Sequence, residues 1–204
     1  MARNFQGPRM RTAGIASLFA ALILSLLSPI SANALVLERP ATIWGNVYAG
    51  PASSSAQSAP PKIAKLEAKS KFIVDYYDFP EWTKIQVQAA VDVWAANFES
   101  AVPIRIMATW GRSSSSAILG SARPGKYFAN FSGAPDPSLW YPSALANALA
   151  GEDLDRDNPE MIITVNSLAN WYRGTGAGPN NTEYDLQSVI LHEMAHGLGF
   201  LSNG

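Results

Sequence analysis

Three residues near the end of the chain, His192, Glu193 and His196, have the types and the spacing needed for metal-assisted hydrolysis. An α-helix turns about 100° per residue, so two histidines four positions apart project from one face and can bind the same ion. Zinc accepts neutral imidazole nitrogens at about 2.0–2.1 Å. Glu193 lies beside the first histidine around the helix, where it can reach a metal-activated water without binding the metal. We therefore predict His192 and His196 as Zn²⁺ ligands and Glu193 as the catalytic residue.

The chemistry expected of such a helix is hydrolysis of a peptide bond. Bound zinc lowers the pKa of its water toward about 7 and polarises the carbonyl that the water attacks. Glu193 would act as the general base that takes the proton from this water and passes it to the leaving amine.

The pattern is specific in this chain because it contains only two histidines in 204 residues. About 1% of random placements would put two histidines four apart, and a glutamate directly after the first lowers that fraction further. The alternative is a core helix with two incidental histidines. That alternative is costly, because imidazoles and a carboxylate in an apolar helix lose free energy unless they have partners.

The first 34 residues have the layout of a secretory signal peptide. Three arginines (Arg3, Arg9 and Arg11) precede an apolar run over 15–27, and Ala32-Asn33-Ala34 supplies a small-residue cleavage site. The apolar run is shorter than the roughly 20 residues of a membrane-spanning helix. We expect a protein secreted to the extracellular space or periplasm, with no stable membrane association after signal cleavage.

The composition of the chain argues against some binding partners and excludes some kinds of active site. The chain has 15 basic and 16 acidic residues, and removing the three leader arginines leaves 12 against 16, a net charge of −4. A mildly acidic protein is not expected to bind nucleic acid. The chain has no cysteine, which excludes a disulfide, a thiolate ligand and a cysteine nucleophile.

Hydrophobic periodicity predicts an α+β domain over 71–204, preceded by a linker or short pro-segment over 35–70. The Gly-, Pro- and Ser-rich stretch 50–61 is typical of a linker, whereas 35–48 is either pro-segment or an extra strand. In the domain, a twisted mixed sheet is expected, with a long backing helix crossing one face and the histidine helix beneath the same sheet. The expected strands begin near Phe72, Val102, Ala117, Tyr127 and Met161, and the expected helices run from about 81 to 99, 143 to 149 and from an N-cap at Asp185.

The segments 161–172 and 189–200, with Tyr184-Asp185 between them, resemble a group of secreted bacterial metallopeptidase-like proteins. The order strand, helix, strands, helix is similar to the N-terminal subdomain of metzincins, which are zincin-like enzymes. In that pattern a glycine turns the chain toward a third metal ligand. Gly199 falls on the glycine position and Ser202 on that of the third ligand. Because serine rarely binds zinc and the chain stops at Gly204, the resemblance implies a domain that is incomplete at its C-terminus.

Two functions are therefore expected to compete. The first is a secreted zinc-dependent metalloendopeptidase acting on a protein or peptide substrate. The alternative is a catalytically incompetent secreted zincin-like binding module or fragment. The acidic stretch 152–158 leaves open a Ca²⁺ site, although it lacks the Gly and Glu positions of an EF-hand, and a solvated acidic turn is the simpler interpretation.

Overall fold

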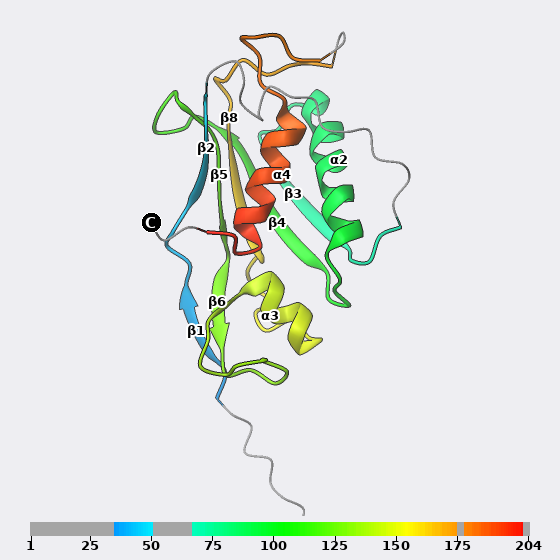
Figure 1. Cartoon of the computed structure of the whole chain (residues 1–204), viewed down its shortest axis with the longest axis vertical. Helices are drawn as coiled ribbons and strands as arrows, with labels where there is room; N and C mark the ends of the chain where they lie inside the picture. The colour runs from blue at the N-terminus through cyan, green and yellow to red at the C-terminus, as the bar shows by residue number, and fades with distance from the viewer. Residues whose placement is uncertain (1–34, 51–66, 175–177, 202–204) are drawn as a thin grey trace, which may run out of the picture. The chain divides into compact units, whose positions relative to one another are not determined.

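Two β-sheets and three helices make up the part of the chain described by this computed structural model, residues 35–50, 67–174 and 178–201 (Figure 1). The larger sheet has the strand order β2-β5-β8-β4-β3 and the smaller one the order β1-β6-β7. The predicted α+β class is confirmed. The strands are β1 (Leu37–Pro40), β2 (Gly45–Tyr48), β3 (Phe72–Tyr77), β4 (Ile104–Gly111), β5 (Ile118–Pro124), β6 (Lys126–Ala129), β7 (Tyr141–Pro142) and β8 (Met161–Asn166).

The larger sheet is mixed, as predicted. Strands β3, β4 and β8 run parallel, whereas β5 is antiparallel to β8, and β2 is antiparallel to β5 at the edge. Alternate residues of β4, namely Ile104, Ile106 and Ala108, are buried, which is the period expected of a strand. This strand begins two residues later than predicted, after Pro103, which has no N–H to donate to a ladder.

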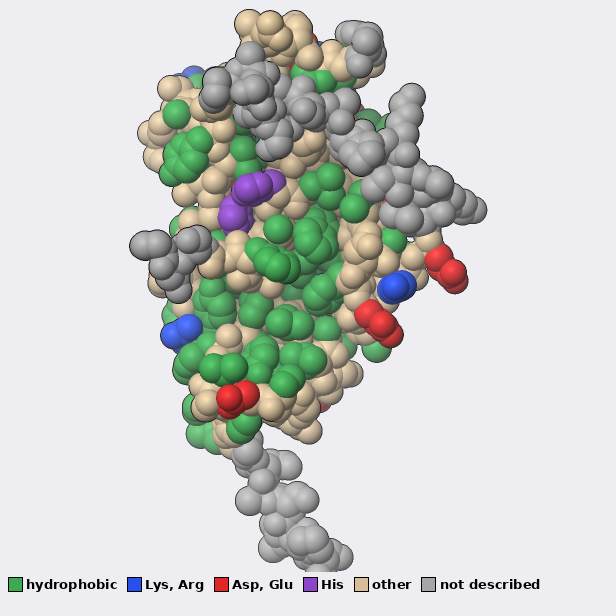
Figure 2. Space-filling view, viewed as in Figure 1, with side chains coloured by type: hydrophobic (Ala, Val, Ile, Leu, Met, Phe, Trp, Pro, Cys, Tyr) green, Lys and Arg blue, Asp and Glu red, His purple; other side chains and the backbone are tan. Residues whose placement is uncertain are grey.

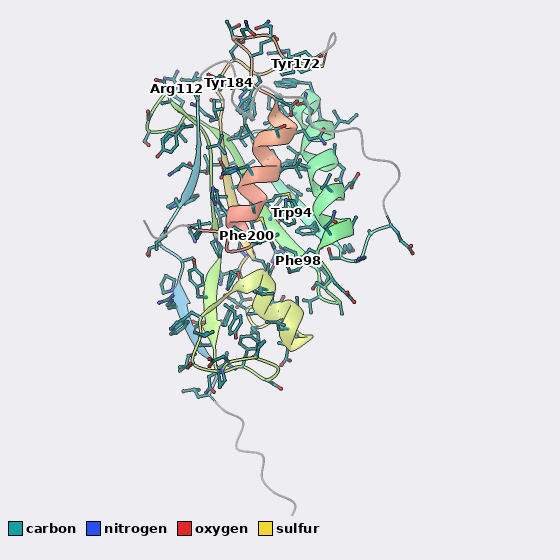
Figure 3. All side chains as sticks on the ribbon, in the orientation of Figure 1. Trp94, Phe98, Arg112, Tyr172, Tyr184 and Phe200 are labelled. Carbon is teal, nitrogen blue, oxygen red and sulfur yellow. The ribbon has the colours of Figure 1, made fainter. Side chains whose placement is uncertain are left out.

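Helices α2 (Glu81–Asn97) and α4 (Leu186–Gly197) lie side by side on one face of the larger sheet (Figure 1). Val87 and Val91 of α2 are buried, as the predicted apolar stripe requires. Trp94 of α2 is directed at α4, and its indole N–H donates to the carbonyl oxygen of Leu191 at 3.0 Å (Figure 3). The shorter helix α3 (Ser143–Ala150) packs on β6.

Local sequence explains where α4 begins and how closely it approaches the sheet. Asp185 is the N-cap, as predicted, and its side chain accepts a hydrogen bond from the N–H of Ser188 at 2.7 Å. Gly197 ends the helix, and a Cβ there would lie 2.3 Å from Cγ of Met161 in β8. The absence of a side chain at Gly197 therefore lets the last turn of α4 rest directly on the central strand.

Residues 35–50 belong to both sheets. β1 pairs with β6 over four residue pairs, and β2 pairs with β5 over four more. Of the alternatives that the sequence left open for 35–48, the structure therefore shows added strands, and whether they also act as a pro-segment is a separate question. The predicted signal peptide and most of the predicted linker lie outside the described residues. Within the described ranges, no helix has the length and apolar character needed to cross a membrane.

Candidate metal and catalytic site

The two histidines of α4 converge, as their spacing predicts. Nε2 of His192 and Nε2 of His196 are 2.8 Å apart, and the two ring centroids are separated by 4.5 Å. Figure 2 shows both rings at the molecular surface, beside a broad area of apolar side chains. Burial, and then the neighbouring His196, lower the pKa of His192, which favours the neutral imidazole that a metal requires.

The separation of the two donor nitrogens is close to that of two imidazole ligands on one zinc ion. Two Zn–N bonds of about 2.0–2.1 Å at a tetrahedral angle place the nitrogens about 3.3–3.4 Å apart. The observed separation of 2.8 Å is shorter by about half an ångström, a change that small rotations of the two rings can supply. Two imidazole nitrogens pointing at one position thus fit a shared cation.

The carbonyl of Phe200 sets the tautomer of His196. Nδ1 of His196 lies 2.7 Å from this oxygen, so Nδ1 carries the proton and donates, leaving the lone pair of Nε2 directed at His192. The chain reaches this position by turning at Gly199, whose φ of +105° is a conformation that favours glycine. Phe200 follows the end of α4 (Figure 3), and its own N–H donates to Ala195 at 3.0 Å.

Glu193 is fully buried, on the side of α4 that faces the sheet. Its Oε1 accepts a hydrogen bond from the backbone N–H of Val47 at 3.0 Å, whereas its buried Oε2 has no hydrogen-bond partner among the described residues. Burial raises the pKa of Glu193 to about 8, and the Val47 N–H opposes this shift. In this arrangement burial disfavours the charged carboxylate and shields Glu193 from water.

Two glycines give the site its close walls. A Cβ at Gly120 of β5 would lie 2.9 Å from Oε1 of Glu193, and a Cβ at Gly45 of β2 would lie 2.1 Å from the ring of His196. The backbone of each strand therefore approaches α4 more closely than any side chain would permit. Through these contacts, strands distant in the sequence lie directly against Glu193 and His196.

A third metal ligand is not seen in the described part of the chain, where no three His, Asp or Glu side chains converge on one position. Ser202, the residue at the third position of the metzincin pattern, lies outside the described residues. The two histidines and Glu193 are thus the predicted site residues that the structure brings together.

The acidic stretch that left open a Ca²⁺ site is tied into local contacts. Oδ2 of Asp155 is 2.7 Å from Nζ of Lys126, and Asn158 donates to the same carboxylate. Asp153 accepts from the N–H of Asp155 at 3.0 Å. These contacts are those of an acidic turn, and they draw on the oxygens that a calcium ion would also need.

Sequence reasoning missed Val47, Gly45, Gly120 and the carbonyl of Phe200. Of these four, the carbonyl of Phe200 was the most predictable from sequence, because Gly199 indicated a turn that brings the chain back toward His196. The two glycines carry no local signal, because their role depends on which strand pairs with which.

Comparisons with known proteins found no family model, no curated protein and no solved structure that matches this chain.

Proposed function

We propose that this chain is an exported zinc-dependent metallopeptidase, whose α+β domain is a zincin-like subdomain of the metzincin type. The observation that carries the proposal is the grouping on α4: two imidazole nitrogens 2.8 Å apart, followed around the same helix by a buried carboxylate with one unpartnered oxygen. A buried polar atom without a partner is rare in folded proteins and frequently marks a catalytic or ligand-binding role.

The residues divide the chemistry between them. His192 and His196 would hold the ion, and Phe200 fixes the His196 ring in the tautomer that frees Nε2. Bound zinc would supply a Lewis acid that polarises a peptide carbonyl and makes water acidic. Glu193 would then accept a proton from the attacking water through Oε2 and deliver it to the leaving nitrogen.

The proposal is tested by metal content and by hydrolysis, measured separately. The purified chain, saturated with zinc and freed of excess, should hold about one equivalent, as a single site of this type does. His192→Ala and His196→Ala should each abolish stoichiometric binding. Glu193→Gln is the matched control, because it should keep the zinc and lose hydrolysis of a quenched fluorescent peptide by about 10²–10⁴-fold. If the parent chain hydrolyses the peptide and Glu193→Gln does so equally fast, this mechanism is excluded.

A non-catalytic zinc-binding module is the second candidate. It is favoured by the described part of the chain, which offers two histidines without a third ligand, and by the complete burial of Glu193. The same measurements separate the candidates, since a binding module holds zinc through the two histidines and hydrolyses nothing in any form.

A further inference from the structure

Strand β2 covers the catalytic side of α4. Gly45 is buried against the ring of His196, with no room for a Cβ, and the N–H of Val47 donates to Oε1 of Glu193 at 3.0 Å. One short segment of backbone thus contacts the second histidine and the general base together. Because Glu193 has no exposed surface in this arrangement, neither water nor a substrate can reach it.

The segment reaches this position by adding a strand to a sheet edge. Residues 37–40 pair with β6 and residues 45–48 pair with β5, antiparallel in both cases. β5 pairs with β8 on its other side, so without β2 it would be the free edge of the larger sheet. A free strand edge next to a binding site is a general means of holding an extended peptide through main-chain hydrogen bonds.

The pairing with β5 is interrupted where the segment meets Glu193. The register shifts between Val47 and Tyr48, and the N–H of Val47 donates to the carboxylate. A shift of this kind re-aims backbone groups out of the ladder. The segment therefore presents a peptide N–H to the catalytic residue, as a bound peptide would.

The segment contributes one side chain, the partly buried Val47, to the edge of the hydrophobic core. All four residues of β1 are exposed, and Trp44 and Tyr48 have 40% and 58% of their surface accessible. The buried positions between 37 and 48 are Ala41 and Gly45, the two smallest residue types. Backbone pairing and a few polar contacts, such as the 2.6 Å hydrogen bond from Ser121 to Asn46, hold the segment in place. A strand held in this way can leave without opening the core.

We infer that residues 37–48 occupy the peptide-binding cleft of this site as an intramolecular ligand, and that the cleft accepts an extended peptide with glycine at the position of Gly45. The inference rests on the proposed function for the identity of the chemistry, and it adds the class of substrate and the reason that the site is closed. Tethering gives the segment an effective concentration in the millimolar range, so a free peptide cannot compete until the tether is cut.

The first test measures peptide binding in the absence of metal, so that no turnover occurs. A recognition sequence for a specific protease is inserted within 51–61 of the full chain, and the protein is compared before and after cleavage in the presence of a chelator. A fluorescent peptide of residues 35–50 should bind the cut protein saturably and the uncut protein at least tenfold more weakly. The same peptide carrying Gly45→Val should bind the cut protein at least tenfold more weakly than the native peptide.

A compensating variant tests whether the preference for glycine at position 45 comes from its contact with the His196 ring. His196→Ala in the cut protein removes the ring that a Cβ at position 45 would meet, so the affinities of the native and Gly45→Val peptides should converge.

In the uncut chain, Val47→Pro removes the N–H bonded to Glu193, whereas Val47→Ala keeps it. Only the proline variant should speed hydrogen exchange over 118–124. Absence of exchange between the peptide and the cut protein, unfolding on cleavage, or equal binding of both peptides would overturn the inference.

The second test adds zinc and a quenched peptide substrate. The cut protein should hydrolyse it at least tenfold faster than the uncut one. If the labelled peptide binds as expected but neither form hydrolyses substrate, the proposed function fails and the cleft assignment stands. If both forms hydrolyse substrate equally and the labelled peptide does not bind, the proposed function stands and this inference fails.

Discussion

Replacing Gly197 by alanine tests how closely α4 rests on the sheet. The new Cβ would lie 2.3 Å from Cγ and 2.5 Å from Sδ of Met161, a residue of the central strand β8 with no exposed surface. Carbon atoms attract one another at about 3.5–4.0 Å, so the overlap with Cγ is about 1.2 Å. Met161 or the last turn of α4, which carries His196, must therefore move.

Two effects of opposite sign decide the outcome. Alanine is better than glycine in a helix interior by about 0.8–1.0 kcal/mol, and the gain is smaller at the last helical residue, where Gly197 lies. Overpacking a filled core costs about 1–3 kcal/mol, and the fully buried Met161 has little space into which it can rotate. We expect the clash to win, with the free energy of unfolding reduced by about 1–2 kcal/mol.

The assay is urea unfolding followed by the fluorescence of the six tryptophans, for Gly197→Ala, Met161→Ala and the double variant. Met161→Ala alone should cost about 2–5 kcal/mol. In that background the clash is gone and the helix propensity remains, so adding Gly197→Ala should be neutral or slightly stabilising. The reasoning is refuted if Gly197→Ala stabilises the parent chain, or if its effect is the same in both backgrounds.

Two further predictions concern buried carboxylates away from the histidines. Burial raises the pKa of Asp185, so the folded state disfavours its charge, and its contribution to stability falls as pH rises from the unfolded pKa through the raised folded one. Asp185→Asn keeps a capping oxygen for Ser188 and should gain stability over the parent as pH rises through that window. Thermal unfolding measures this, and a difference in stability between the two proteins that does not change with pH would contradict the prediction. Glu160, 2% exposed, accepts hydrogen bonds from the N–H of Arg105 at 2.6 Å and from the amide of Asn147 at 3.1 Å. Glu160→Ala should cost about 2–5 kcal/mol in urea unfolding by removing an acceptor from both donors, and Glu160→Gln clearly less, because its amide oxygen still serves one of them.

Much of the fold follows from local patterns in the sequence. The 3.6-residue stripe of Val87 and Val91 and the cap at Asp185 predicted two helices, because each signal lies within the element that it specifies. The alternation of side-chain types over 102–110 predicted β4 in the same way, and the structure buries alternate residues of that strand. The histidine pair was also predictable, because a separation of four residues on a helix fixes its geometry before any tertiary contact forms.

The covering of the site was not predictable from those patterns. Val47 and Glu193 are separated by 146 residues, and no local signal near Val47 distinguishes a strand at the edge of β5 from a linker. Nor does the sequence reveal that a side chain at Gly120 would collide with Glu193, or one at Gly45 with His196. These contacts can be recognised only once the register of β2 on β5 is known. The pairing of strands distant in the sequence was therefore the part of the structure that local patterns could not predict.

The 146 residues between Val47 and Glu193 affect the order in which the contacts of the molecule form. During synthesis at about 5–20 residues per second, Val47 precedes its partner Glu193 by roughly 7–30 s. Contacts between residues so distant in sequence carry a large loop-closure cost and form late in folding. The parallel strands β3 and β4, joined through α2, can pair well before α4 exists. We therefore expect the contact between Val47 and Glu193 to be among the last to form.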